Sequence, residues 1–413
     1  MTAPATTAGR DRYLDLLRAL ALVRVVAYHT VGGAVFSLVF PSMGVMFALA
    51  GALMARSLRR PAAQVLRSRT RRLLLPLWVY SATVLALLLA AGWRPGVQEP
   101  GSWWQVLLWF LPISNAVFPE TVGTGAMVDP GWAVQAGEIL WYLRAYFWFM
   151  VLSPVLLAAF RARPWPVLLA PLALGVPLAL ELVALPEWAG PAVVDFATYG
   201  SCWVLGFAHA TGRLRRVPLQ AVLAAGLTVM ALGLWWAAGH REDGWDLNEI
   251  PLAQALWSLG FSAVLLRISP VWQQLPRPLR FLERGVSLLN NRAMTVYLWH
   301  NLLLVATVVV IDVLWNSETL ADAVPALLNS SWTQFALVWP MLAVVFLAVG
   351  WVEDVSAGRR ARLWPSRTPP PRPLSQGTVP QDTLPQSTVP GRSWLYPRQM
   401  REDAASSVLH RQP

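Results

Sequence analysis

The chain has 413 residues, of which 56% are hydrophobic and only 13% are charged. A charged share roughly half that of soluble domains, with long apolar runs between the charges, excludes an ordinary soluble fold and places most of the chain in lipid. The formal net charge of +11 does not indicate a nucleic-acid partner, because a nucleic-acid-binding protein carries its basic residues on a soluble face rather than between apolar runs.

Long apolar runs dominate the chain from about residue 14 to about residue 353. A hydrocarbon core about 30 Å thick is crossed by roughly 20 apolar residues of helix. The sequence therefore predicts an all-α fold, a polytopic integral membrane helical bundle of about ten transmembrane helices. The predicted spans lie near residues 14–35, 41–58, 73–92, 138–160, 165–184, 192–211, 218–238, 250–268, 293–315 and 333–353. The apolar stretch 103–118 is broken by Pro112 and Asn115, so we expect an interfacial or re-entrant element there.

The distribution of arginine predicts the orientation of these spans. The loop after the second span contains a run of basic residues: Arg56, Arg59, Arg60, Arg67, Arg69, Arg71 and Arg72. Short cytoplasmic loops collect Arg, whereas the translocated loops do not. Counted alternately from this loop, the predicted outer loops are poor in Arg and rich in Asp and Glu. We therefore expect a multi-pass protein of the cytoplasmic membrane with both termini in the cytoplasm.

Three regions follow from this pattern. Residues 1–12 are expected to form a short cytoplasmic N-terminus, and residues 13–355 form the transmembrane domain. Residues 356–413 are rich in Pro and Arg, with a near-repeat that begins at Thr378. Such a composition cannot build a packed core, so we expect a disordered cytoplasmic tail.

The first span carries four ionisable residues: Asp15, Arg18, Arg24 and His29. At 100° per residue, Asp15, Arg18 and His29 share one face of the helix, and Arg24 points to the opposite side. Arg18 and His29 lie about 16 Å apart along the axis, with Arg18 nearer the cytoplasm. Ionisable residues inside a bilayer often mark function, and a neutral His can accept a proton from a hydroxyl. A structural role remains open, with Asp15 and Arg18 as an interfacial ion pair and His29 bonded to a neighbouring helix.

The segment RYLDLLRALALVRVVAYH, residues 12–29, resembles the signature of the acyltransferase-3 family of membrane-bound O-acyltransferases. Four further segments resemble family segments in the same order, and they lie at residues 42–58, 67–80, 140–157 and 295–304. The resemblance thus covers about residues 10–353 and identifies 13–355 as an acyltransferase domain. It implies that His29 and Arg18 are catalytic and that acyl-CoA is the usual donor. Two positions depart from the family pattern: Arg144 stands where many relatives carry an acid, and Arg24 is unexpected.

Five further residues are candidates for donor-binding or supporting roles. Arg69 and Arg72 lie on one helical face at the start of the third span, where they could bind the phosphates of acyl-CoA or act only as a topology signal. His300 lies in the ninth span beside Tyr297. It could orient His29, or it could be a core histidine with its hydrogen bonds satisfied. Asp15 is the third supporting candidate, because it lies one turn before Arg18.

The expected activity is transfer of an acyl group from acyl-CoA to a hydroxyl of a glycan or of another cell-envelope or secondary-metabolite acceptor. The expected partners are the donor, the acceptor and the lipid bilayer, without nucleic acid. The sequence assigns no protein partner. No bound cofactor is expected, and no metal, because no group of His and carboxylates has ligand spacing and Cys202 is the one cysteine. The alternative is a secondary transporter with a proton or substrate path through Asp15, Arg18, His29 and His300, although no inverted repeat supports it.

Overall fold

The computed structural model describes residues 11–96, 103–119, 132–241 and 244–364, and these residues contain helices and no β-strand. The near-repeat after Thr378, nearly all of the predicted tail and most of the predicted N-terminus lie outside the described residues. Ten described helices have sixteen or more residues: α1 (Arg12–Val31), α3 (Ser42–Ser57), α4 (Ala62–Ala90), α6 (Leu140–Ala162), α7 (Pro164–Ala179), α8 (Gly190–Ala210), α10 (Leu219–Gly239), α11 (Pro251–Arg267), α13 (Ala293–Trp315) and α16 (Ser331–Val349). Each coincides with one predicted span.

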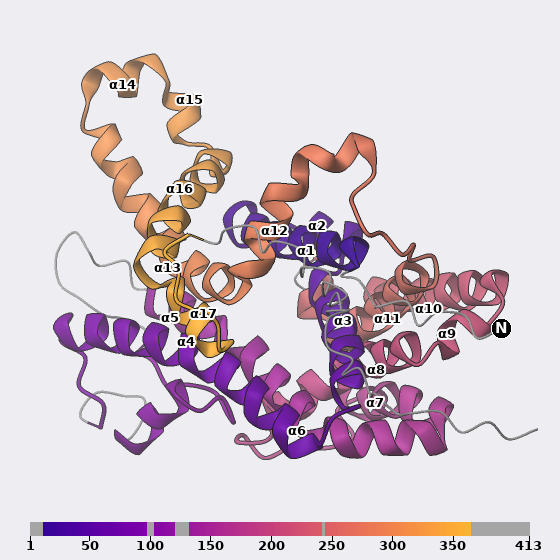
Figure 1. The fold of residues 1–413 in the computed structure, drawn as a ribbon. Helices are drawn as coiled ribbons and strands as arrows, with labels where there is room; N and C mark the ends of the chain where they lie inside the picture. The colour runs from indigo at the N-terminus through magenta and orange to yellow at the C-terminus, as the bar shows by residue number, and fades with distance from the viewer. Residues whose placement is uncertain (1–10, 97–102, 120–131, 242–243, 365–413) are drawn as a thin grey trace, which may run out of the picture. The chain divides into compact units, whose positions relative to one another are not determined.

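Shorter elements connect these helices (Figure 1). They are the helices α2 (Val35–Val39), α5 (Trp132–Glu138), α9 (Arg213–Arg216), α12 (Glu283–Asn291), α14 (Glu318–Ala323), α15 (Pro325–Leu328) and α17 (Trp351–Ser356), and the 3-10 helices η1 (Trp103–Trp109), η2 (Leu247–Glu249) and η3 (Arg277–Leu282). The stretch 103–118 is not a continuous helix, since η1 ends at Trp109 and irregular backbone follows.

Six segments of the described chain are long and apolar enough to cross a membrane. They are Val35–Ser57, Ala62–Ala90, Trp132–Ala162, Leu219–Gly239, Ala293–Trp315 and Ser331–Val349. α1 is not among them, because Asp15, Arg18 and Arg24 interrupt its apolar sequence. The chain is thus an all-α multi-pass membrane protein, and the count of ten spans stays a prediction.

The largest difference from the predicted boundaries is at the start of the third span. The third span is predicted near residues 73–92, but α4 already begins at Ala62, so residues 62–72 of the Arg-rich segment form its first three turns. The segment AAQVLRSRTRR contains mostly good helix formers, and Pro61 stands at its N-cap, so the helix begins at Ala62. Arg69 and Arg72 therefore lie on a helix that continues directly into an apolar span.

The core is built around α3, which is buried along nearly its whole length. α3 packs closely against α8, because Gly51 faces the backbone carbonyl of Trp203 and Gly206 faces that of Ala48. A Cβ atom at Gly51 would lie 2.1 Å from the carbonyl oxygen of Trp203, so only glycine permits this approach. α1 packs against α3, α12, α13 and α16, so Asp15 is buried and Arg18 and Arg24 are partly buried.

Candidate active site

Arg18 and His29 line two different cavities. α1 begins with Asp11, whose side chain accepts a hydrogen bond from the Tyr13 amide, and it ends before Gly32, whose φ is 71°. Arg18, in its second turn, lines a first cavity of about 650 Å³, and His29, in its last turn, lines a second of about 590 Å³. The structure thus places both predicted residues at cavities, but not at the same one.

The hydrogen bonds of His29 define its tautomer. The Nδ1 atom lies 2.9 Å from the carbonyl oxygen of Val25, one turn earlier in α1. A carbonyl oxygen only accepts hydrogen bonds, so Nδ1 must carry the hydrogen. In the neutral ring the Nε2 atom is then left with a free lone pair, and His29 is exposed at the second cavity. A bare ring nitrogen at a cavity is what a general base requires.

His300 lies directly behind His29. It is fully buried in α13, and its Nδ1 atom lies 2.7 Å from the carbonyl oxygen of Tyr297. By the same argument its Nδ1 carries the hydrogen and its Nε2 can only accept. That Nε2 atom lies 3.4 Å from Nδ1 of His29, and the ring centroids are 5.0 Å apart. His300 therefore provides a second acceptor for the His29 proton, which supports the orienting role over an unrelated core histidine.

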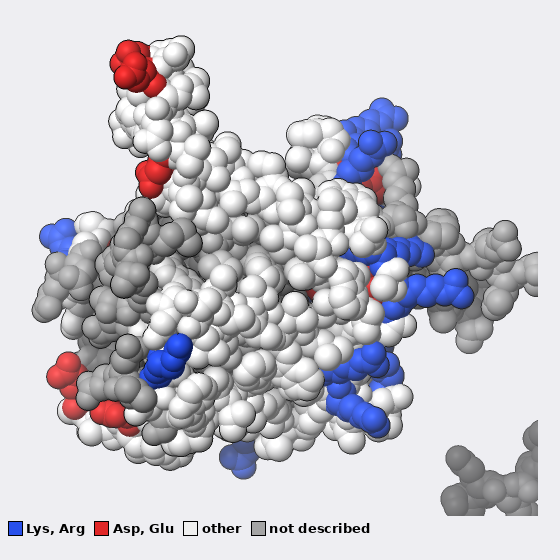
Figure 2. All heavy atoms as spheres, turned by 90° about the vertical axis from the view of Figure 1, so that its left-hand side faces the viewer, with Lys and Arg blue, Asp and Glu red and all other residues white. Residues whose placement is uncertain are grey.

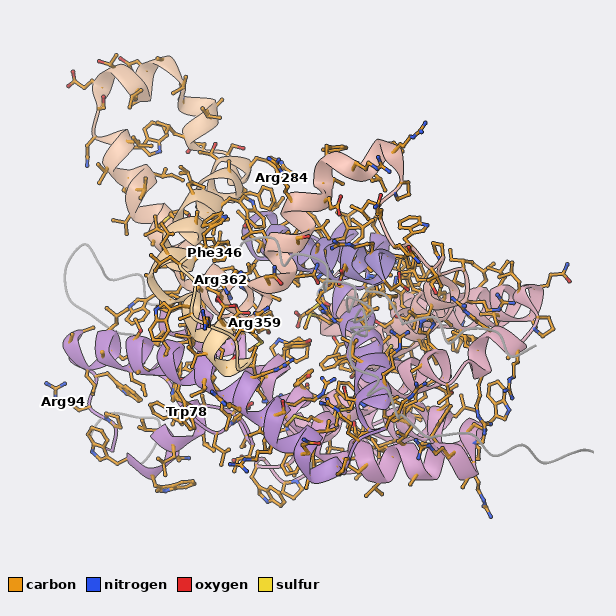
Figure 3. All side chains as sticks on the ribbon, in the orientation of Figure 1. Trp78, Arg94, Arg284, Phe346, Arg359 and Arg362 are labelled. Carbon is orange, nitrogen blue, oxygen red and sulfur yellow. The ribbon has the colours of Figure 1, made fainter. Side chains whose placement is uncertain are left out.

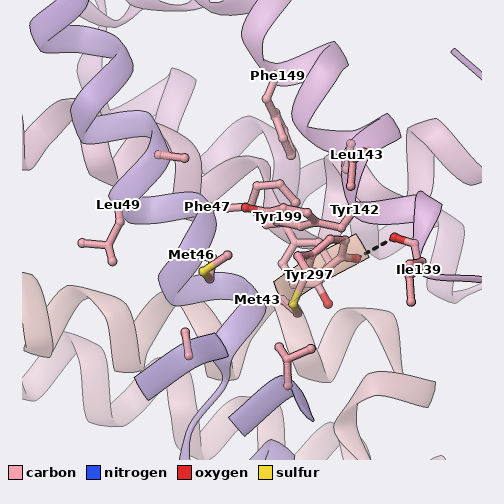
Figure 4. Packing of buried hydrophobic residues seen from close by; sticks show 14 of the residues in the cluster. Met43, Met46, Phe47, Leu49, Ile139, Tyr142, Leu143, Phe149, Tyr199 and Tyr297 are labelled. Carbon is pink, nitrogen blue, oxygen red and sulfur yellow. Dashed lines mark hydrogen bonds between the residues drawn. The ribbon is translucent and has the colours of Figure 1, made fainter. Parts of the chain in front are cut away.

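A layer of aromatic rings and methionine side chains lies where the two cavities meet. Tyr297 lines both of them, and the Tyr297 hydroxyl donates to the carbonyl oxygen of Ile139 at 2.6 Å (Figure 4). The ring of Tyr142 lies 4.9 Å from that of Tyr297 and 4.8 Å from that of Phe47. On α3, Met46 faces the first cavity and Met43, one turn earlier, faces the second. We call the layer of Met43, Met46, Tyr142 and Tyr297 the septum.

The first cavity is strongly basic. Arg69 donates from Nη1 to the Tyr146 hydroxyl and from Nη2 to the Ser57 hydroxyl, both at 2.9 Å, so its guanidinium is held in one orientation. Arg72 lines the same cavity one turn further along α4. The structure therefore unites four of the predicted site residues, Arg18, Arg69, Arg72 and Tyr297, at one cavity.

Sequence reasoning did not find Glu353, which also lines the first cavity. Its Oε1 atom accepts hydrogen bonds from the amide and the hydroxyl of Thr295, at 2.7 and 2.5 Å. Thr295 lies in the first turn of α13, so Glu353 caps the helix that carries Tyr297 and His300. Burial raises the pKa of Glu353 to about 7, although its bonds to Thr295 oppose this shift. No local signal in the sequence connects residues 295 and 353.

Asp15 lines neither cavity. Its carboxylate is 3.7 Å from Nη1 of Arg12, and Asn290 donates to its backbone carbonyl. Arg12 also approaches Glu283, at 3.4 Å, so this group joins the start of α1 to α12. The position favours the structural interpretation of Asp15 over a role beside Arg18 or His29.

The two positions that depart from the family pattern both lie at the second cavity. Arg144 forms an ion pair with Asp195 at 2.6 Å and also donates to the side chain of Asn115. Arg24 donates to the carbonyl oxygen of Phe36 and lies over the ring of Tyr28. No carboxylate of the described residues forms an ion pair with Arg24, and its Nη2 atom is buried without a hydrogen-bond partner among them.

The rest of the second cavity is polar and aromatic. The Tyr28 hydroxyl donates to Asp246 at 2.7 Å, which holds the end of α1 against the loop before η2. Trp141 and Tyr199 stack at 5.6 Å, and both line this cavity. Within the described part of the chain, no three His, Cys, Asp or Glu side chains are grouped as metal ligands.

Comparison with known proteins gives one match. A family model described as an acyltransferase domain matches residues 11–352, which is most of the chain. No curated protein and no solved structure matches the chain. The matched region contains α1, α4, α13 and nearly all of both cavities. Because the match covers most of the chain, the chain belongs to the acyltransferase-3 family and is a membrane acyltransferase.

Proposed function

We propose that this chain transfers an acyl group from acyl-CoA to a hydroxyl of a glycan or of another cell-envelope or secondary-metabolite acceptor. One observation carries the proposal: a cavity rich in arginine and a cavity containing His29 meet at a single side chain, Tyr297. The first cavity suits the phosphates of a donor, since one Arg side chain can donate two parallel hydrogen bonds to a phosphate group. The second suits a hydroxyl-bearing acceptor, because it combines a free imidazole nitrogen with stacked aromatic rings.

In direct transfer the acceptor hydroxyl would approach Nε2 of His29. His29 would take the hydroxyl proton as the oxygen attacks the thioester carbonyl carbon. The carbon–sulfur bond would then break, and the CoA thiolate would leave and take a proton from His29, which restores the neutral ring. The imidazolium formed in between would keep two acceptors for its Nδ1–H, the carbonyl oxygen of Val25 and Nε2 of His300. Cys202 is fully buried, which argues against it as an acyl-carrying nucleophile.

The donor would enter from the cytoplasm, with the first cavity on that side. Positive loops favour the cytoplasmic side of a membrane. On the face drawn in Figure 2, most basic side chains gather toward one side and most acidic side chains toward the other, including those on the protruding α14–α15 turn. The His29 cavity would then lie deeper in the membrane or toward its outer side. The family match gives no support to the transporter alternative.

The test uses the purified full-length protein in lipid nanodiscs with acetyl-CoA and an envelope glycan fraction. We expect release of free CoA together with a glycan product heavier by one acetyl group. His29→Ala should lower the rate by about a hundredfold or more, which is the usual effect of losing a general base. Equal CoA release and product formation by wild type and His29→Ala would overturn the proposal. Donor analogues of increasing chain length would then identify the acyl group.

A further inference from the structure

A segment beyond the family-matched region forms one wall of the first cavity. The match ends at residue 352, yet Glu353, Ser356, Ala357 and Arg359 all line the cavity. These residues belong to α17 and to the chain that follows it. Figure 3 labels Arg359 on this segment, beside α4 and near Arg362. The cavity assigned to the donor is therefore incomplete without residues that the family match does not include.

This wall is anchored to the helices around it. Arg292, whose side chain is 0% exposed, pairs with Asp354 at 2.9 Å and donates to the carbonyl oxygen of Arg362 at 3.0 Å. On the other side, Arg71 of α4 donates to the carbonyl oxygen of Val355 at 2.9 Å. These contacts hold the backbone on both sides of Arg359, so its side chain starts from a defined position at the cavity.

Arg359 is the arginine of this wall that can leave its carboxylate partner and bind another anion. It pairs with Asp354 at 3.0 Å, and its side chain is 49% exposed. Asp354 also pairs with the fully buried Arg292, so its charge stays compensated when Arg359 turns to another anion. Asp354 is buried, but about half of the Arg359 side chain faces solvent, which lowers the cost of this exchange. Arg292, in contrast, cannot leave without stranding a buried carboxylate.

The charges around Arg359 favour a polyanion. Five arginines line the cavity: Arg18, Arg60, Arg69, Arg72 and Arg359. Glu353 is the one carboxylate residue among the described lining residues, and it also caps α13. Such an excess of guanidinium groups attracts a ligand with several phosphates rather than a single carboxylate.

We propose that Arg359 binds a phosphate of the nucleotide portion of the donor, so that the segment after α17 completes the donor site. This inference rests on the proposed function, because it takes acyl-CoA as the donor. Arg359 would exchange Asp354 for the phosphate, while Arg292 holds Asp354 in place. The contact adds a charge-assisted hydrogen bond at the exposed edge of the cavity.

Equilibrium binding to the full-length protein in nanodiscs tests this, with CoA, 3′-dephospho-CoA and pantetheine as probes. We expect Arg359→Gln to weaken CoA binding by about tenfold, the value of one hydrogen bond to a charged group. Arg360→Gln is the matched control, since Arg360 is the exposed neighbour and does not line the cavity. The control should bind CoA as wild type does. Pantetheine, which has no nucleotide phosphate, should bind equally to all three proteins.

The probes also identify the phosphate. A loss seen with CoA but not with 3′-dephospho-CoA supports the ribose phosphate, and a loss seen with both supports the diphosphate. Unchanged CoA binding by Arg359→Gln, or an equal loss of pantetheine binding, overturns the inference and leaves the proposed function intact. Absence of CoA binding by wild type overturns the proposed donor itself. Arg359→Lys keeps the charge without the planar fork, and it supplies the same comparison if the Gln variant does not fold.

Discussion

The Nε2 atom of His300 lies 3.4 Å from the Nδ1 atom of His29, although 271 residues separate the two in the chain. Because Nδ1 of His300 is bound to the Tyr297 carbonyl, His300 meets His29 as an acceptor. The pair therefore leaves the Nε2 atom of His29 free at the second cavity. This relationship connects the two helices that carry the site, α1 and α13.

Removal of the His300 ring should lower turnover without affecting donor binding. We expect His300→Ala to reduce kcat by about tenfold, since the imidazolium of His29 loses one of its two acceptors. His300→Gln can still present an oxygen to His29, so it should recover part of the loss. Steady-state kinetics with acetyl-CoA would check this. A rise in the KM for the donor at constant kcat would contradict the positioning role.

The septum predicts that substitution of Tyr297 weakens the coupling of CoA release to formation of the acyl product. Tyr297→Ala would open a path between the two cavities, so water should reach the thioester more easily. We expect the ratio of CoA released to acyl product formed to rise several-fold in this variant. Tyr297→Phe loses the bond to Ile139 but keeps the ring, so it should stay near the wild-type ratio. An unchanged ratio in Tyr297→Ala would mean that the septum does not limit access of water.

Arg72 and Arg67 provide a matched pair on α4. Both are exposed, but Arg72 lines the first cavity and Arg67 does not. We expect Arg72→Ala to raise the dissociation constant for CoA by about tenfold, through loss of one phosphate contact. Arg67→Ala should leave it unchanged. Equal dissociation constants for CoA in the two variants would contradict a phosphate-binding role for Arg72 and favour its interpretation as a topology signal.

Glu353 predicts a dependence of stability on pH. Its pKa rises from about 4.5 to about 7 on folding, so the folded state binds more protons than the unfolded state between these values. The free energy of unfolding should therefore fall as the pH rises from about 4.5 to about 7, by about 1–3 kcal/mol from this group. Glu353→Gln should remove that part of the decrease.

The measurement is the apparent Tm of each protein at pH 5 and at pH 8. The difference should be smaller in Glu353→Gln than in wild type. Glu283→Gln is a suitable control, because Glu283 lies on α12 and does not line the cavity. Equal differences in all three proteins would show that Glu353 does not titrate on folding in this range.

Much of the fold was predictable because its signals are local. Apolar runs of about 20 residues identify long helices without reference to the rest of the chain. Each of the ten predicted segments contains a long helix, and the break predicted in 103–118 from Pro112 and Asn115 is present as irregular backbone. The start of α4 was not predictable in this way. An Arg-rich segment can form a loop or a helix, and its composition alone does not distinguish the two.

The sequence by itself determined the helices, the shared face of Arg18 and His29, and the family. These depend on residues close together in the chain, whose spacing sets their position on a helix. The tertiary structure decided which ionisable groups meet: His29 with His300, Glu353 with the start of α13, and Arg359 with the donor cavity. It also placed Arg18 and His29 at separate cavities on either side of Tyr297. Such meetings depend on how helices distant in sequence pack, and no local pattern encodes that packing.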